Sequence, residues 1–291
     1  FDPDGAVHDH VERVARLALE HQHVAGPGRD LAKEDRHRLE TALVGSTKGL
    51  QLRDAMLCEL YDDQVNVVQG VIGGEHRMGA GERIDVVQPH RHSARLGTLT
   101  NAGHAEATAA VEAAMAAKAD WEATPFDERA AVILRAADLL AGPWREKLAA
   151  ATMLGQSKTA IQAEIASACE LIDSWRFNVA FARQIYAEQP ISSPGVGNRT
   201  DHRPLEGFVY AITPFNFTAI AGNLPTAPAL MGNTVVWKPA SSAMLSAYYI
   251  MRLLEAAGMP PGVINFVPGD AVQISGLLLD SPDLAGIHFT G

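Results

Sequence analysis

The stretch GFVYAITPFNFT, residues 207–218, predicts the fold most directly. Its first half is a compact apolar run, typical of a strand buried on both faces, and Pro214 then ends that run in a turn. Three more apolar runs follow, each after a segment whose apolar residues recur at helical spacing: residues 234–238, 263–267 and 285–289. Strands that alternate with helices predict right-handed β-α-β units on a parallel sheet, so the expected fold class is α/β.

The carboxyl ends of these strands are the expected ligand sites, because ligands of open parallel sheets bind there. The first end carries Asn216, whose amide could donate a hydrogen bond to a developing oxyanion or could cap the following helix. The second carries Lys238, which suits ribose hydroxyls or a phosphate, with a solvated surface charge as the alternative. At the third, the turn 268–270 could offer free N–H groups to a phosphate or be only a turn. No GxGxxG occurs, so the usual dinucleotide fingerprint is missing.

The chain before residue 207 has a different character. Residues 1–70 are charged and rich in His, and predict a peripheral helical arm, whereas short strands are expected between residues 71 and 98. Helices are expected from 101 or 104 to 121, and at 125–140, 143–154 and 157–186. The last of these stacks five apolar residues on one face: Ile161, Ile165, Ala168, Ile172 and Trp175. The polar stretch 190–204, which carries Pro and Gly, predicts a loop or an extended hairpin arm.

Composition excludes several classes of protein. The formal net charge of −10 over 291 residues gives no basic footprint for nucleic acid or for an anionic membrane surface. No apolar run approaches the roughly 20 residues of a membrane span. The two cysteines, Cys58 and Cys169, lie outside any CxxC spacing and predict buried thiols in a reducing, cytoplasmic setting. The histidine pairs are spaced i,i+2, which does not place both rings on one helix face, so no metal site is predicted.

Four segments, in this order and spacing, carry a resemblance to the aldehyde dehydrogenase superfamily. They are PFNFT (214–218), GNTVVWKP (232–239), AAGMPPGVINFVPGD (256–270) and FTG (289–291). The resemblance covers roughly residues 70–291. It implies an aldehyde-dehydrogenase-like fold that binds NAD in a Rossmann variant without the glycine fingerprint. Residues 71–291 would then be the N-terminal part of the NAD-binding domain.

Within the superfamily, the chain is most similar to the L-glutamate γ-semialdehyde (1-pyrroline-5-carboxylate) dehydrogenases of proline breakdown. The segments TMLGQSKTAIQAEI (152–165) and CELIDSWRFNVAFARQI (169–185) are of that type. The resemblance implies oxidation of the aldehyde through a thiohemiacetal and a thioester. It matches Glu170 to an acidic residue near the aldehyde pocket; the alternative is a polar helix position that interacts with Arg176 and Asp173.

The resemblance also implies roles for residues at the strand ends. Asn216 would be the side-chain donor of the oxyanion hole, Phe217 would pack against the aliphatic part of the substrate, and Lys238 would hold the adenosine ribose. The residues that would line the NAD cleft are Ile212, Thr213, Pro214, Phe215, Lys238, Gly269, Asp270, Phe289, Thr290 and Gly291. Members of the family assemble through an arm like that at 190–204, so a homodimer or higher homo-oligomer is expected.

The family's nucleophilic cysteine and its glutamate base would follow Gly291, and neither Cys58 nor Cys169 has the flanking pattern of the nucleophile. The chain also opens on Phe1 without a signal-like run, and is expected to be a piece of something longer. Three hypotheses follow: a glutamate-semialdehyde dehydrogenase whose catalytic part lies elsewhere, a non-catalytic module that binds a nucleotide or a partner, or another aldehyde dehydrogenase subfamily. The 291 residues alone are expected to be inactive and to bind NAD weakly or not at all.

Overall fold

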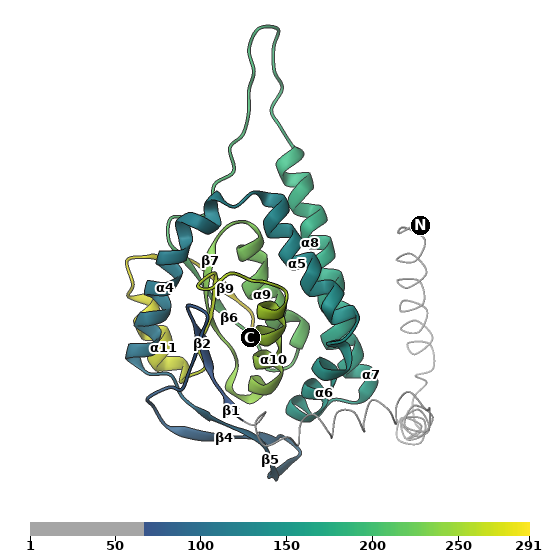
Figure 1. Ribbon diagram of the computed structural model, residues 1–291, viewed down its shortest axis with the longest axis vertical. Coiled ribbons are helices and arrows are strands. Elements are labelled where there is room, and N and C mark those ends of the chain that lie inside the picture. Colours follow the sequence, from purple (N-terminus) through teal and green to yellow (C-terminus); the bar gives the residue numbers. More distant parts are fainter. Residues whose placement is uncertain (1–66) are drawn as a thin grey trace, which may run out of the picture. The chain divides into compact units, whose positions relative to one another are not determined.

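The computed structural model describes residues 67–291 (Figure 1). The helical arm predicted for residues 1–70 therefore lies almost wholly outside the described residues. Its last few positions are extended rather than helical, since strand β1 covers Val67–Val68 and strand β2 begins at Gly70.

A six-stranded sheet with the order β3-β2-β8-β7-β6-β9 forms the centre of the described part. Its strands are β2 (Gly70–Ile72), β3 (Glu75–Arg77), β6 (Phe208–Ile212), β7 (Thr234–Lys238), β8 (Ile264–Phe266) and β9 (Leu284–Phe289). The four strands β6 to β9 are mutually parallel, whereas β2 pairs antiparallel with both β3 and β8. The predicted parallel α/β sheet is thus confirmed, with an antiparallel hairpin added at one edge.

A second sheet has the order β1-β5-β4. Strands β4 (Arg83–Gln88) and β5 (Arg91–Thr100) form an antiparallel hairpin, and the register shifts near its turn. This hairpin accounts for the later short strands expected before residue 98, whereas the first of them, at residue 71, is β2 of the six-stranded sheet.

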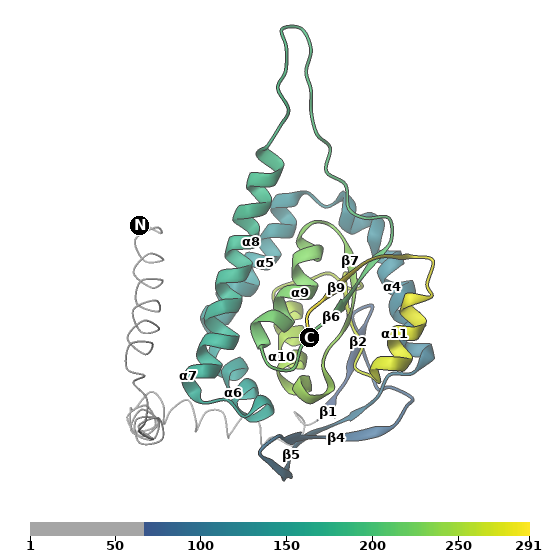
Figure 2. The same ribbon diagram turned by 180° about the vertical axis from the view of Figure 1, so that it is seen from behind.

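Helices cover both faces of the six-stranded sheet (Figures 1 and 2). One face carries α4 (His104–Ala123) and α11 (Ala271–Leu279); the other carries α9 (Thr218–Leu230) and α10 (Met244–Ala256), with α5 (Phe126–Ala141), α6 (Arg145–Gln156) and α8 (Glu170–Ala187) packed outside them. Successive strand residues alternate between the faces. Phe208 and Tyr210 pack with the α4 and α11 core, while Val209 and Trp237 pack with the larger core under α9 and α10. Burial on both faces explains why these strands are continuous apolar runs.

The helix predicted for residues 157–186 differs from the prediction in its first half. It begins at Ala160 as α7 (Ala160–Ala163), continues as a π-helical segment η1 (Glu164–Cys169), and only then becomes α8. The wider π-helical turn rotates the buried face relative to a uniform α-helix. Ile161 and Ile165 are therefore exposed, although Trp175 and its neighbours are buried as predicted.

The stretch between α8 and β6 forms a long projecting loop (Figure 1). It has one isolated bridge, between Ser193 and Val196, and no named strand. Side chains tie its two limbs together, because Thr200 N donates to Gln189 Oε1 at 2.9 Å and Asn198 Nδ2 donates to the Ile191 carbonyl at 2.8 Å. The arm predicted at 190–204 is thus an extended loop closed by side-chain hydrogen bonds.

The close approach of α8 and α9 depends on Gly222. A Cβ atom added there would lie 2.7 Å from a methyl carbon of the fully buried Leu171. We expect Gly222→Ala to lower the free energy of unfolding by about 1–3 kcal/mol through overpacking. The matched control is Gly276→Ala on α11, where a Cβ atom meets nothing within 4 Å. That variant should gain up to about 1 kcal/mol, because alanine favours helix. Urea unfolding of both variants would measure the difference, and equal stabilities would contradict the packing argument.

Candidate functional site

The carboxyl ends of the parallel strands lie edge to edge, as their topology predicted. Ile212 pairs in register with Lys238 on one side and with Phe289 on the other. The pairing continues past the strands, because Thr213 N donates to the Lys238 carbonyl and Thr290 N donates to the Ile212 carbonyl, both at 3.3 Å. Five of the residues predicted to line a cofactor cleft are therefore adjacent along one edge of the sheet.

Lys238 is largely buried, being only 5 % exposed. The alternative prediction, a solvated charge at a strand end, is therefore wrong. Burial lowers the pKa of Lys238, and the negative charge of Asp270 partly offsets that effect. Within residues 67–291 its ammonium makes no hydrogen bond or ion pair, so its donors remain available to a ligand.

The turn at residues 268–270 is closely packed. Ala102 N donates to the Pro268 carbonyl at 2.7 Å, and a Cβ atom at position 269 would lie 2.9 Å from the Ala102 carbonyl oxygen, so only glycine fits there. Asp270 caps α11 by accepting hydrogen bonds from the N–H groups of Val272 and Gln273, at 3.0 and 2.9 Å. Those two N–H groups are thus satisfied internally, which favours the prediction of a plain turn over that of a phosphate site.

The first strand end is anchored from inside the core. Trp237 Nε1 donates to Thr213 Oγ1 at 2.9 Å, and both residues are buried. Pro214 is buried as well, whereas the Phe215 ring is 61 % exposed. Thr213 therefore fixes the backbone of the predicted cleft, and Phe215 presents an exposed aromatic ring there.

Asn216 is exposed and does not cap the helix that follows it. The N-cap of α9 is Phe217, and α9 has no side-chain cap. The capping alternative is therefore wrong. No hydrogen bond to the Asn216 amide occurs within the described part of the chain, which leaves both of its N–H donors available.

Phe217 and Glu170, the two predicted substrate residues, are connected through a residue that sequence reasoning missed. Lys158 Nζ lies over the Phe217 ring, 4.2 Å from its centroid. Burial lowers the pKa of Lys158, and the charge of Glu170 counteracts this. Partial burial raises the pKa of Glu170, and Lys158 counteracts that. The only available signal was the position of Lys158 within the segment GQSKT.

Glu170 begins α8 and lines a shallow groove of about 510 Å³, together with Asp173, Ser174, Phe177, Asn178 and Phe181. The alternative in which Arg176 interacts with Glu170 does not hold, because Arg176 Nη2 instead donates to Asp138 Oδ1 at 2.9 Å. Glu170 forms no ion pair within residues 67–291. Its carboxylate is thus not held in an ion pair, and the Lys158 ammonium acts on it only through its longer-range field.

A polar network that the sequence did not reveal holds the start of α9. Thr218 Oγ1 lies 2.8 Å from Thr152 Oγ1 and accepts a hydrogen bond from Gln156 Nε2 at 2.8 Å. Gln156 Nε2 also donates to Ser246 Oγ at 2.9 Å. Thr152, Thr218 and Ser246 are buried, so this network fixes where the turn carrying Asn216 meets its helix.

Cys169 does not have the surroundings of a nucleophile. Burial and the charge of Glu164 raise its pKa, although Arg145 lies close enough to donate to its sulfur at 3.6 Å. A raised pKa leaves little thiolate at neutral pH. Across residues 67–291 no group of three metal-ligating side chains occurs, and no helix combines the length and apolar character that spanning a membrane requires.

Residues 76–291 match the sequence model of the aldehyde dehydrogenase family. This chain belongs to that family. The strand-end edge, with its buried lysine and exposed asparagine, thus belongs to an aldehyde dehydrogenase fold. The fold and family that the four segments implied are confirmed.

Known relatives show which members of the family this chain resembles. The chain is 53% identical over 197 residues to the mitochondrial delta-1-pyrroline-5-carboxylate dehydrogenase of Emericella nidulans, covering 67% of this chain and 34% of that protein. It is 46% identical over 251 residues to the mitochondrial enzyme of that name from Rattus norvegicus, covering 86% and 44%. The crystal structure of the Mycobacterium tuberculosis delta-pyrroline-5-carboxylate dehydrogenase bound with NAD superposes with a TM-score of 0.81 at 70% identity, covering 84% of this chain and 46% of that one. The chain thus spans less than half the length of these relatives.

Proposed function

We propose that the protein containing this chain oxidises L-glutamate γ-semialdehyde, the open form of 1-pyrroline-5-carboxylate, to L-glutamate with NAD. Residues 71–291 contribute part of the NAD-binding domain in this proposal. The similarity to dehydrogenases of that name, up to 70% identical, supports the choice of substrate. A non-catalytic binding module and another aldehyde dehydrogenase subfamily are the alternatives that the experiment below separates.

The observation that carries the proposal is the position of Asn216. Its exposed amide follows the carboxyl end of β6, and its donors are not used within residues 67–291. When a nucleophile adds to an aldehyde, the carbonyl oxygen gains negative charge, and a fixed amide donor stabilises that charge. Phe217, the next residue, offers an aromatic surface for the aliphatic part of the substrate. No residue of this chain is proposed as the nucleophile or as its base.

The strand-end residues fit an NAD cofactor. Lys238 is a buried cation that makes no hydrogen bond or ion pair among the described residues, and the negative charge of Asp270 acts on it only from a distance. A lysine in that position suits the hydroxyls of a ribose, and the exposed Phe215 ring offers an apolar wall. Bound NAD would accept the hydride from the substrate carbon. In this proposal the chain's own residues bind and orient the cofactor, and Asn216 holds the reacting oxygen.

The remaining proposals concern the oligomeric state and the cellular compartment of the protein. The projecting arm at 190–204 exposes Ile191 and Val196 and has no apolar core of its own. We therefore assign it to contacts between copies in a homodimer or higher homo-oligomer. A cytoplasmic location remains a prediction from cysteine usage, and the fungal and rat relatives are named as mitochondrial proteins.

The direct test is NADH formation by the full-length protein. We expect turnover with 1-pyrroline-5-carboxylate and a much lower kcat/KM with propanal and other aliphatic aldehydes. A preference for the aliphatic aldehydes would assign the protein to another subfamily. Binding of NAD in calorimetry without oxidation of any aldehyde would favour the non-catalytic module.

Lys238 provides a second prediction that does not depend on turnover. Lys238→Met should weaken NAD binding about 10- to 100-fold, because a hydrogen bond from a charged donor contributes about 1.5–3 kcal/mol. The control is Lys118→Met on α4, where the lysine is paired with Glu122 at 2.8 Å away from the strand ends. Titration calorimetry would measure the NAD dissociation constants of the Lys238→Met and Lys118→Met variants. Equal affinities for the two variants would exclude Lys238 from the cofactor site.

A further inference from the structure

Lys158 is the charged side chain at the candidate site that the proposed function leaves unexplained. It lies in the short connection between α6 and α7, far in sequence from the Asn216 turn. We propose that Lys158 is a positioning residue, whose ammonium holds the Phe217 ring and, through it, the orientation of the Asn216 amide. This inference rests on the proposed function, because it assigns Lys158 to the oxyanion donor of that same site.

The connection that carries Lys158 is firmly anchored on both sides. Ser157 adopts a left-handed conformation with φ 55°, and its Oγ lies 2.7 Å from His90 Nδ1 in the β4–β5 turn. On the other side, Thr159 and Gln162 exchange two hydrogen bonds at the start of α7, at 3.0 and 3.3 Å. A non-glycine residue in the left-handed region costs free energy and persists only where its surroundings enforce it. The backbone therefore delivers the lysine to one defined place.

The contact of Lys158 with Phe217 is not a by-product of an ion pair. Within residues 67–291 its ammonium has no carboxylate within salt-bridge distance, and Glu170 acts on it only through its longer-range field. The aromatic ring, 4.2 Å away at its centroid, is thus the direct partner of the charge. A cation over an aromatic face is attracted by the negative charge density of the ring, and more strongly where water is partly excluded.

Fixing the ring also fixes its neighbour. Phe217 is the N-cap residue of α9 but uses no side-chain cap, and the Thr218 network holds only the helical side of the turn. On the strand side, the last internal side-chain anchor is the hydroxyl of Thr213. Between these two anchors, Lys158 supplies the contact that restrains Phe217 and the adjacent Asn216.

The kinetic test uses Lys158→Met, Lys158→Arg and Phe217→Leu in the full-length protein. Lys158→Met should lower kcat about five- to thirtyfold, the range of a partly desolvated cation–π contact, with an unchanged dissociation constant for NAD. Lys158→Arg should restore most of kcat, because a guanidinium also stacks on an aromatic ring. In a Phe217→Leu background, Lys158→Met should cost nothing further. An equal cost in both backgrounds would overturn the inference.

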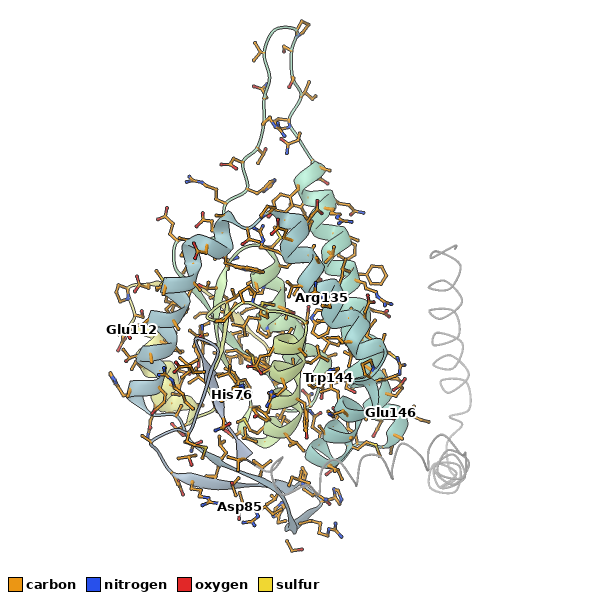
Figure 3. The ribbon with its side chains drawn as sticks, viewed as in Figure 1. His76, Asp85, Glu112, Arg135, Trp144 and Glu146 are labelled. Carbon is orange, nitrogen blue, oxygen red and sulfur yellow. The ribbon has the colours of Figure 1, made fainter. Side chains whose placement is uncertain are left out.

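Lys147→Met is the matched control, because Lys147 also lies over an aromatic ring, 5.2 Å from the centroid of Trp144. Trp144 lies at the start of α6 and is labelled in Figure 3. It removes the same kind of contact outside the candidate site and should leave kcat unchanged. A loss in kcat equal to that of Lys158→Met would show a general effect and refute the positioning role.

A spectroscopic measurement separates the contact from the catalysis. Lysines reductively methylated with ¹³C-formaldehyde and a borohydride reductant give one NMR signal each, and Lys158→Arg assigns the signal of Lys158. That signal should be shifted upfield by the ring and return to the ordinary position in Phe217→Leu. If the wild-type protein oxidises no aldehyde, the proposed function fails while this measurement still decides whether the contact exists. An unshifted signal in the wild type would rule out the contact and the inference with it.

Discussion

Asn216→Ala is expected to lower kcat for 1-pyrroline-5-carboxylate about 10²- to 10³-fold in the full-length protein. That range is the usual cost of removing one donor from an oxyanion hole. The Asn216 amide is exposed and has no hydrogen bond within residues 67–291, so its removal breaks no internal contact of the described part. Stability and NAD affinity should therefore stay close to wild type, and stopped-flow measurement of NADH formation would show the loss in the chemical step.

Asn216→Asp tests whether the loss of activity comes from the missing N–H donors or from the smaller side chain of the alanine variant. It retains the volume of the side chain but replaces the N–H donors with acceptor oxygens, which repel a developing negative charge. We expect a loss at least as large as that of the alanine variant. Near-wild-type turnover by either variant would remove Asn216 from the oxyanion site and leave the geometry at the end of β6 without a catalytic role.

The strands and their ends were predictable because burial on both faces gives a sequence signal. Residues 207–212 and 234–238 are continuous apolar runs, and the β-α-β connection rule places their carboxyl ends at one edge. The location of Asn216 and Lys238 at that edge follows from this placement alone. Their family roles needed the resemblance, because spacing alone favoured a capping asparagine and a solvated lysine.

Features that depend on tertiary packing gave no signal in the sequence from which they could be predicted. The π-helical segment at 164–169 inserts a wider turn into a helix whose composition is ordinary, so periodicity predicted one uniform face including Ile165. Lys158 and Phe217 meet across 59 positions of sequence, and no period links them. The 5 % exposure of Lys238 likewise depends on how the elements around it pack. In each case the deciding contact joins elements that only the folded chain brings together.

Trp237→Ala is expected to lower the free energy of unfolding by about 3–5 kcal/mol, because it leaves a large cavity in the core. Its ring is fully buried, packs edge-on against Phe266 with centroids 5.0 Å apart, and donates to Thr213 Oγ1. Thermal and urea unfolding would measure the loss. A change below about 1 kcal/mol would show that this ring does not support the sheet.

The conservative variant Trp237→Phe separates core packing from the site. It keeps an aromatic ring but removes the hydrogen bond to Thr213, at a cost of about 1 kcal/mol. Trp175→Phe is the matched control, because Trp175 is equally buried and donates to a threonine hydroxyl, that of Thr226, at 2.8 Å. Both variants should lose similar stability, but only Trp237→Phe frees Thr213 at the strand end and should weaken NAD binding. If calorimetry gives the two variants equal NAD affinities, the position of Thr213 does not depend on Trp237. The backbone pairing of β6 with its neighbouring strands would then hold the cofactor edge alone.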